Sequence, residues 1–527
     1  MTTGPALDLA SLLDQADRVV AGATRSLRDA GGPDAAQSLA YDLAHAASAL
    51  ATARASLAFA AFGPTERALV EAFTGLALAD LHQRVLGRED LWGVSAGWFD
   101  DLAPFVARQR DPAVLAALAE VPDERHLGED FAMVQDVFRR FADDQVRPHA
   151  EHVHRANADI PESVIAGLRD LGGFGLSVPT RYGGDATGDE HEYVAMVVAT
   201  EELSRASLGI GGSLITRPEI LARALLAGGT EEQKSQWLPR VASAEVLAAI
   251  AVTEPDYGSD VAHLTTTATR TEGGWLLNGV KTWCTFAARA TVLVVLARTD
   301  PDRAKAHRGL TLFLVEKPTA DGHGFVLDQP GRGGRLEGRP IDTLGYRGMH
   351  SYEVSLANWF VPDSHVVGGP DGIGQGFYYQ MAGFENGRLQ TAARALGVMQ
   401  AAYEAALAYA RQRSVFGTPI VDYELTRVKL GTMAAIIQCS RQFALAVARR
   451  MTTGGGSREA AMAKAYVCRA AEWVTREAMQ IHGGMGYAEE FPVSRYYVDA
   501  RVLSIFEGAD ETLCLKVISR GLVSSPA

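Results

Sequence analysis

The spacing of apolar residues changes twice along this chain of 527 residues. Up to about residue 246, and again from Gly376 to the end, apolar residues recur at the three- to four-residue spacing that is typical of helices. Between these regions, short runs rich in Val, Leu, Thr and aromatic residues are bounded by glycines, as in strands. A β-rich region set between two helical regions predicts an α+β protein with three layers.

The β-rich region contains five segments with the composition of strands and turns between them. They are 247–255, 268–287, 290–299, 309–318 and 352–362. Two dipeptides, Gly273–Gly274 and Asn278–Gly279, are typical of hairpin turns. The glycine-rich segment GRGGRLEG at 331–338 lies between strands with no following helix, so we expect a flexible surface loop and not a phosphate cradle.

A chain of this length exceeds what one hydrophobic core usually organises. We expect a helical N-terminal extension at 1–122, an α-helical domain at 123–246, a middle β-domain at 247–366 and a C-terminal helical bundle at 367–527. In the extension, segments 38–62 and 64–87 show helical spacing. We expect the extension to serve packing or interaction and to carry no chemistry of its own.

The net charge of −13 argues against nucleic acid as a partner, because binding to phosphates needs a positive surface. The four cysteines show no metal-ligand spacing, which indicates free thiols in a reducing compartment. The N-terminus lacks an apolar signal core, and no run of about 18 apolar residues suggests a membrane span. We therefore expect a cytoplasmic protein.

The sequence lacks the short motifs of several common enzyme classes. No GxGxxG joins a strand to a helix, no HExxH is present, and GxSxG is absent. We predict no metal site. Three other segments carry residues suited to chemistry, and they lie at 251–262, 278–287 and 479–511.

The first two segments suit the binding of a flat polar ring. Thr253, Gly258 and Ser259 place two hydroxyls and a glycine, which lets a ligand approach the backbone, at the end of a predicted strand. Strand alternation would put Trp283 and Thr285 on one face. The alternative for this pair is a core tryptophan beside a buried threonine.

The third segment contains a carboxylate between apolar residues. Glu507 follows Ile505 and Phe506 and precedes Gly508, a residue that a helix interior does not favour. A carboxylate in such an apolar setting can act as a general base. The alternative is an exposed carboxylate at the start of a helix.

Taken together, the motifs AVTEPDYGSD, KTWCT, RSVFG, QIHGGMGY and IFEG resemble the acyl-CoA dehydrogenase family, in the family's order and spacing from about residue 125 to 522. The resemblance implies the fold of that family, with FAD between the β-domain and the C-terminal helices. It implies FAD contacts at thirteen positions: Val252, Thr253, Gly258, Ser259, Trp283, Thr285, Arg413, Phe416, Gln480, Gly483, Gly484, Ala509 and Glu511. The contacts in RSVFG and QIHGG would reach the FAD of a neighbouring subunit.

The resemblance also implies a mechanism in which Glu507 removes the α-proton of an acyl-CoA thioester while hydride leaves Cβ for the flavin. In a minority of the family the base precedes an arginine on another helix, and that position is Gly387 here, which cannot take a proton. The implied substrate contacts are Ser259, Glu385, Arg388 and Gly508. Electron-transfer flavoprotein would accept the electrons, and shared FAD contacts imply a homo-oligomer, a dimer or a tetramer.

The sequence departs from the family pattern at several positions. Ala509 stands where the family often has threonine, which puts one flavin hydrogen bond in doubt. Ser519 replaces a frequent arginine near coenzyme A, although Arg520 is adjacent, and Cys284 stands where an aliphatic residue is usual.

Three features are similar to the methylsuccinyl-CoA dehydrogenase subgroup: the N-terminal extension, LGYRGMHSYEV at 344–354, and Thr216–Arg217. That subgroup makes mesaconyl-CoA in the ethylmalonyl-CoA pathway, and its substrate carries a second carboxylate, which needs a cation if buried. We nominate Arg217 as that cation; the alternative is a surface arginine at a helix start. Rival functions are a short- or branched-chain monoacyl-CoA dehydrogenase, an acyl-CoA oxidase, and a non-enzymatic flavin-binding stress protein of the same fold.

Overall fold

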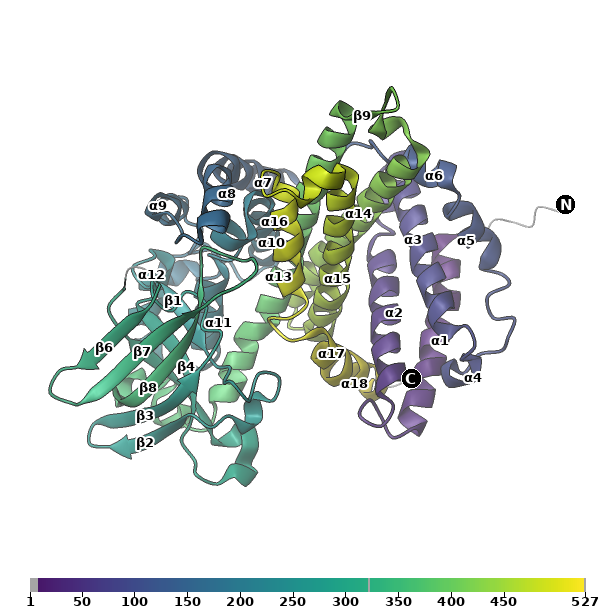
Figure 1. Ribbon diagram of the computed structural model, residues 1–527. Helices are drawn as coiled ribbons and strands as arrows, with labels where there is room; N and C mark the ends of the chain where they lie inside the picture. The colour runs from purple at the N-terminus through teal and green to yellow at the C-terminus, as the bar shows by residue number, and fades with distance from the viewer. Residues whose placement is uncertain (1–7, 321–322, 526–527) are drawn as a thin grey trace. The chain divides into compact units, whose positions relative to one another are not determined.

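The computed structural model describes residues 8–320 and 323–525, which form two compact units (Figure 1). Unit 1 combines the N-terminal residues up to 133 with residues 391–527, and unit 2 is residues 134–390. Helices α7 (Glu129–Phe141) and α13 (Gly376–Gln412) contain the points where the chain passes from one unit to the other. The four-domain division expected from the sequence stays a prediction.

In its described residues, unit 1 is helical apart from the short hairpin of β9 (Ser414–Val415) and β10 (Thr418–Pro419), and it combines segments from the N-terminal and C-terminal parts of the chain. The N-terminal helices pack directly on the C-terminal ones, with α2 in contact with α14 and α15. The helices that lie wholly within this unit are α1 (Leu9–Asp29), α2 (Gln37–Ala55), α3 (Pro64–Val85), α4 (Glu89–Trp92), α5 (Ala103–Gln109), α6 (Pro112–Ala117), α14 (Glu424–Met451), α15 (Ser457–His482), α16 (Pro492–Leu503), α17 (Asp510–Thr512) and α18 (Arg520–Ser524).

Helix α2 is a core helix of this unit. Its alanine-rich sequence favours the helix, because alanine has the best helix propensity. Twelve of its 19 residues are buried, so it is covered on most sides and not on one stripe alone. The small side chains allow α1, α3, α14, α15 and the π-helical turn η11 (Leu513–Ser519) to approach it. The predicted helices at 38–62 and 64–87 are confirmed as α2 and α3, with a short 3-10 turn after α2.

Helix α14 is the one helix in the described part of the chain that is long and apolar enough to cross a membrane. The core helix of a globular protein meets the same criteria, and 83% of the apolar stretch of α14 is buried within the protein. It is therefore weak evidence for a membrane span.

Unit 2 contains an eight-stranded mixed sheet and a set of helices. The strands run in the order β1-β4-β2-β3-β8-β7-β6, and β5 pairs with β4. They are β1 (Ala248–Ala251), β2 (Thr267–Thr271), β3 (Gly274–Lys281), β4 (Val292–Arg298), β5 (Leu310–Glu316), β6 (Phe325–Gln329), β7 (Gly334–Ile341) and β8 (Ser351–Pro362). The helices are α8 (Arg147–Ala156), α9 (Glu162–Asp170), α10 (Glu190–Ala206), α11 (Thr216–Gly228) and α12 (Glu231–Ala242).

The two predicted hairpin turns have different outcomes. Strands β2 and β3 are antiparallel and joined at Gly273, whose φ of 72° lies in the left-handed region that glycine tolerates, so this turn is confirmed. The prediction of a turn at Asn278–Gly279 is wrong, because both residues lie inside β3 at a β-bulge opposite β8. A Cβ on Gly279 would approach Thr266 Oγ1 to 2.5 Å, so the glycine serves close backbone packing.

The expectation of a flexible loop at 331–338 is also wrong in part. Residues from Gly334 onward belong to β7, which pairs with β6 and β8. Only the turn before it, with Gly331 and Gly333 at positive φ, is a loop. Every second residue of β7 is buried from Gly334 to Gly338, and the pattern was hidden in the sequence because two of the buried residues are glycines.

Candidate active site

Glu507 lies in a tight turn between α16 and α17. Its own φ is 55° and that of Gly508 is 97°, so two successive residues have left-handed backbone. A Cβ on Gly508 would lie 2.9 Å from Leu513 Cδ2, which explains the glycine. Glutamate at positive φ is uncommon and is tolerated where surrounding contacts fix the backbone. The turn therefore holds the carboxylate in a defined place and is a candidate site of chemistry.

The Glu507 side chain is mostly buried, with 8% of its surface exposed, so it is not an exposed carboxylate at a helix start. Its Oε1 lies 3.8 Å from Nη2 of Arg394, a fully buried residue of α13. The Arg394 guanidinium also lies 4.7 Å from the centre of the Phe506 ring. A carboxylate in this position, beside a fixed cation and an aromatic ring, can accept a proton from a ligand in a largely water-free setting.

Contacts from neighbouring helices fix the Glu507 turn. Lys464 Nζ of α15 donates to the Gly508 carbonyl oxygen at 2.5 Å. Burial lowers the pKa of Lys464. The backbone N–H of Asp510 donates to the Ser504 carbonyl oxygen at 3.1 Å and closes the turn. The Ser504 hydroxyl in turn donates to Glu472 Oε1 at 2.5 Å.

In unit 2, Trp283 and Thr285 do not lie on a strand, which corrects the expectation that they share a strand face. Strand β3 ends at Lys281, and Trp283 has a left-handed φ of 58°. The chain leaves the ladder there because the Cys284 and Phe286 N–H groups donate instead to carbonyls of the segment around β8, those of Tyr352 and His350, at 2.9 and 2.8 Å.

This backbone change projects the indole outward. Trp283 is 55% exposed, which excludes the alternative of a core tryptophan. Thr285 is buried, and its hydroxyl lies 3.1 Å from the Ser351 hydroxyl. Cys284 is buried between them, and burial raises the pKa of its thiol to about 12, so it behaves as a small apolar residue. An exposed ring next to a positioned hydroxyl suits a flat, polar ligand.

The segment 252–259 is anchored by a buried ion pair that the sequence reasoning missed. Lys281 Nζ donates to Glu254 Oε1 at 2.9 Å and to the Val252 carbonyl oxygen at 3.0 Å. Burial alone would raise the pKa of Glu254, but Lys281 and hydrogen bonds from Thr265 and Thr266 lower it to about 2. A signal was present, because alternation in β3 places Lys281 on the buried face, where a charge needs a partner.

The predicted FAD contacts of this segment lie along its length. The Thr253 carbonyl accepts a hydrogen bond from the N–H of Thr282, next to Trp283, at 2.9 Å. Val252 is buried, whereas Gly258 and Ser259 are exposed in the turn that follows. The structure thus connects the two predicted FAD segments of unit 2 by direct contacts.

Unit 1 contains a cavity of about 600 Å³ next to the Glu507 turn. Its lining includes Ala509 and Glu511, two of the predicted FAD contacts, and the side chains of Arg469, Arg476 and Arg501. Trp473 and Tyr497 complete a partly aromatic wall. The carboxylates of Glu472, Asp510 and Glu511 also line the cavity, and Arg501 pairs with Glu472, so Arg469 and Arg476 are the lining arginines that could bind a phosphate of a dinucleotide such as FAD.

The predicted contacts to a neighbouring subunit's FAD lie on two exposed segments of unit 1. Arg413 directly precedes the hairpin of β9 (Ser414–Val415) and β10 (Thr418–Pro419), and Phe416 lies in its turn, where it is fully exposed with a φ of 50°. Gln480, Gly483 and Gly484 are exposed at and just after the end of α15.

Three of the predicted substrate contacts in unit 2 lie on α11 and α13. Arg217 is 6% exposed at the start of α11, and its Nη1 donates to the Tyr346 hydroxyl at 3.0 Å, which excludes the alternative of a surface arginine. Glu385 and Arg388 are half-buried on α13, with Gly387 between them in the sequence. Sequence reasoning missed Glu219, a fully buried carboxyl two residues after Arg217, whose burial raises its pKa to about 7.

The chain matches three family models in sequence order. They are the acyl-CoA dehydrogenase N-terminal domain at residues 128–245, the middle domain at 249–359 and the C-terminal domain at 374–522. The (2S)-methylsuccinyl-CoA dehydrogenase of Cereibacter sphaeroides is 41% identical over an alignment that covers 78% of this chain and 74% of that protein.

Solved structures agree with these matches. Butyryl-CoA dehydrogenase from Megasphaera elsdenii has a TM-score of 0.68 and 29% identity, and the match covers 76% of this chain and 99% of that one. A glutaryl-CoA dehydrogenase from Mycobacterium smegmatis in complex with FADH2 has a TM-score of 0.67 and 26% identity, and covers 78% and 99%. The chain therefore belongs to the acyl-CoA dehydrogenase family, FAD-dependent oxidoreductases that act on CH–CH groups.

Proposed function

We propose that this protein oxidises (2S)-methylsuccinyl-CoA to mesaconyl-CoA in the ethylmalonyl-CoA pathway, with Glu507 as the base. Two observations support the substrate: the 41% identity to a (2S)-methylsuccinyl-CoA dehydrogenase, and the burial of Arg217. Arg217 carries the dicarboxylate part of the proposal, because a guanidinium buried beside a tyrosine hydroxyl is suited to bind a second carboxylate.

The proposed reaction divides the work between the residues described above. Glu507 takes the α-proton of the thioester, and the Cα–Cβ double bond forms as the second hydrogen leaves Cβ. When bound, FAD supplies the two-electron acceptor for this step. The residues that would hold the flavin are Val252, Thr253, Gly258, Ser259, Trp283, Thr285, Ala509 and Glu511.

The substrate and the remaining partners complete the proposal. Ser259, Gly508, Glu385 and Arg388 would contact the acyl-CoA. Arg413, Phe416, Gln480, Gly483 and Gly484 would reach the FAD of a second copy, so we expect a dimer or a tetramer. A fully exposed phenylalanine supports this part, because Phe416 would become covered. We further propose a cytoplasmic location, supported by four buried free cysteines, and electron-transfer flavoprotein as the acceptor.

Anaerobic bleaching of the bound flavin's visible absorbance tests this function. The purified protein is mixed separately with (2S)-methylsuccinyl-CoA, butyryl-CoA and isobutyryl-CoA. Fast bleaching by the dicarboxylic thioester alone is expected. Bleaching mainly by the monoacyl thioesters would discard the substrate and keep the mechanism, and no bleaching with any of them would favour a flavin-binding protein without this activity.

Arg217→Met tests the carboxylate clamp within the same assay. Loss of a charged hydrogen bond costs about 1.5 to 3 kcal/mol, so kcat/KM for methylsuccinyl-CoA is expected to fall about tenfold to a hundredfold. Butyryl-CoA has no second carboxylate and serves as the control substrate, for which a change under about threefold is expected. Equal losses on both substrates would contradict the clamp.

A further inference from the structure

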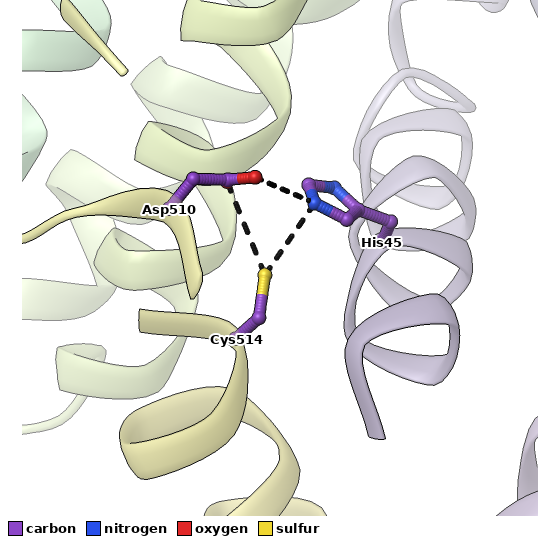
Figure 2. Close-up of side chains that lie close together, drawn as sticks. All are labelled: His45, Asp510 and Cys514. Carbon is purple, nitrogen blue, oxygen red and sulfur yellow. Dashed lines mark hydrogen bonds and ion pairs between the residues drawn. The ribbon is translucent and has the colours of Figure 1, made fainter. Parts of the chain in front are cut away.

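A buried polar cluster joins the N-terminal helices to the Glu507 turn (Figure 2). The Tyr41 hydroxyl of α2 donates to Asp510 Oδ2 at 2.7 Å, and His45 Nε2, one turn further along the same helix, lies 3.0 Å from the same oxygen. Cys514 Sγ lies 3.5 Å from His45 Nε2. His45 and Asp510 are 3% and 7% exposed. One carboxylate is thus held by two side chains of a helix that lies 465 residues away in the sequence.

The charges in the cluster define its hydrogen bonds. Burial would raise the pKa of Asp510, but the hydrogen bonds from His45 and Tyr41 bring it below its ordinary value. Burial lowers the pKa of His45, so its imidazole is neutral. Because a carboxylate only accepts hydrogen bonds, His45 Nε2 must carry a proton and donate a hydrogen bond to Asp510.

The same side-chain types can also bind a metal ion, but the distances between them are those of hydrogen bonds. The contacts of Tyr41 and His45 with Asp510 already satisfy its buried carboxylate oxygen. A hydrogen-bonded anchor therefore accounts for the cluster.

Asp510 ends the turn that carries Glu507. Its backbone N–H closes the turn onto the Ser504 carbonyl, so any shift of Asp510 moves the end of the loop that runs from Ser504 to Asp510. Lys464 holds the middle of the loop through the Gly508 carbonyl. Lys464 and Ser504 belong to the region matched by the family model, whereas Tyr41 and His45 lie outside every matched range.

We propose that helix α2 is a positioning element of the active site, in which His45 and Tyr41 hold Asp510 and thereby fix the carboxylate of Glu507 for proton removal. The inference rests on the proposed role of Glu507 as the base. It gives the N-terminal helices, expected from the sequence to carry no chemistry, a defined structural role. They supply the outer anchor of a loop whose inner anchors are in the C-terminal bundle.

Rapid-mixing measurements of flavin reduction test the anchor, because they separate the limiting rate constant from the Kd of the acyl-CoA. A displacement of about 1 Å in a catalytic group can lower a rate about a hundredfold. His45→Ala is expected to lower the limiting rate constant at least about tenfold and to change Kd less than about twofold. Tyr41→Phe, which removes a single hydroxyl and leaves the His45 contact, is expected to lower it about threefold.

A conservative variant and a matched control separate positioning from general damage. His45→Gln offers an amide N–H near the position of Nε2 and is expected to restore most of the rate. Ser48 is equally buried on α2, and its hydroxyl donates to the Ala44 carbonyl of its own helix, so Ser48→Ala is expected to react at the wild-type rate. Thermal unfolding and FAD content are measured for every variant.

Several results would overturn the inference. One is a wild-type limiting rate constant in both His45→Ala and Tyr41→Phe. Others are a limiting rate constant in Ser48→Ala as low as in His45→Ala, or one in His45→Gln no higher than in His45→Ala. A loss of rate that only follows the FAD content of the variants would also contradict it. One bound zinc ion per chain by elemental analysis would also overturn the hydrogen-bonded arrangement. A different variant detects a failure of the proposed function. If the flavin of Glu507→Gln is reduced by the acyl-CoA at the wild-type rate, Glu507 is not the base, and the inference about α2 is then also wrong.

Discussion

The Glu507 turn and the Trp283 segment are built alike. Each begins just after a regular element, at Leu503 of α16 and at Lys281 of β3. Each places its candidate functional side chain on left-handed backbone, with φ of 55° and 58°. Each also lies beside a buried lysine: Lys464 donates to the Glu507 turn, and Lys281, two residues before Trp283, donates to the neighbouring segment 252–259. Left-handed backbone directly after a helix or strand aims one side chain in a direction that the regular element could not.

The two regions differ in where their anchors come from. The segment after Trp283 is bonded to Tyr352 and His350, which lie in or next to a neighbouring strand of the same sheet. The Glu507 turn is bonded to His45, on a helix outside the family-matched residues. The segment proposed to bind flavin is therefore anchored within the β-rich region, whereas the turn with the proposed base also depends on the N-terminal helices.

Replacement of the base is expected to have the largest effect and to separate the two regions by function. Glu507→Gln keeps the shape but cannot accept the proton, so the limiting rate of flavin reduction should fall about a hundredfold to ten-thousandfold. FAD content should stay at the wild-type value. Glu490→Gln, in an exposed position of unit 1, is the control and should not change the rate. A large loss of FAD in Glu507→Gln would contradict this separation, because the Glu507 turn would then also be needed to bind the flavin.

The two lysines provide the next comparison. Lys281→Met leaves Glu254 as a buried carboxylate without a cationic partner, so the free energy of unfolding of unit 2 should fall by about 3 to 5 kcal/mol. Lys464→Met removes a hydrogen bond to a carbonyl and should cost unit 1 about 1 to 2 kcal/mol. Denaturant unfolding of both variants, followed by circular dichroism, checks the difference. Equal losses would show that the two lysines contribute alike.

Acid should weaken the segment 252–259, which neighbours Trp283, through Glu254. The folded-state pKa of about 2 lies below the ordinary 4.5, so Glu254 contributes stability that is fully present above pH 4.5 and is lost as the pH falls toward 2. The difference corresponds to about 3 kcal/mol at most. Unfolding free energies from pH 5 to 3 should decline less steeply in Glu254→Gln. An unchanged slope in that variant would contradict this role.

The smallest expected effect concerns the hydroxyl of Thr285. Thr285→Val removes the contact with Ser351 and should lower the free energy of unfolding by about 0.5 to 1.5 kcal/mol. Ser351→Ala breaks the same contact and serves as the matched variant. If Thr285 also contacts the flavin, only Thr285→Val should shift the visible flavin spectrum. Identical spectra would limit Thr285 to a structural role.

Much of the architecture was predictable because it depends on local patterns. The period of apolar residues predicted the helices α2 and α3 and the position of the β-rich region, and the Gly273 turn followed from the preference of glycine for positive φ. Gly508 likewise indicated a break beside Glu507, and its φ of 97° accounts for it. The motifs in sequence order were sufficient for the family, and the family models confirm it.

Predictions that required knowledge of long-range partners were less successful. Asn278–Gly279 has the composition of a hairpin turn, but pairing with β8 makes it a bulge inside a strand. Trp283 and Thr285 follow strand alternation in the sequence, but the backbone after Lys281 leaves β3 because its N–H groups donate to carbonyls in and next to β8. In both cases hydrogen bonds to a segment distant in the sequence override the local preference.

The sequence by itself determined the fold class, the family and the residue types of the candidate site, because these depend on local periodicity and on short motifs. Only the tertiary structure decided how the site residues are held. It paired Lys281 with Glu254 inside unit 2, and it placed His45 against Asp510 across 465 residues of chain. Burial makes each of these polar groups need a partner, and which partner lies within reach is set by the packing of the elements.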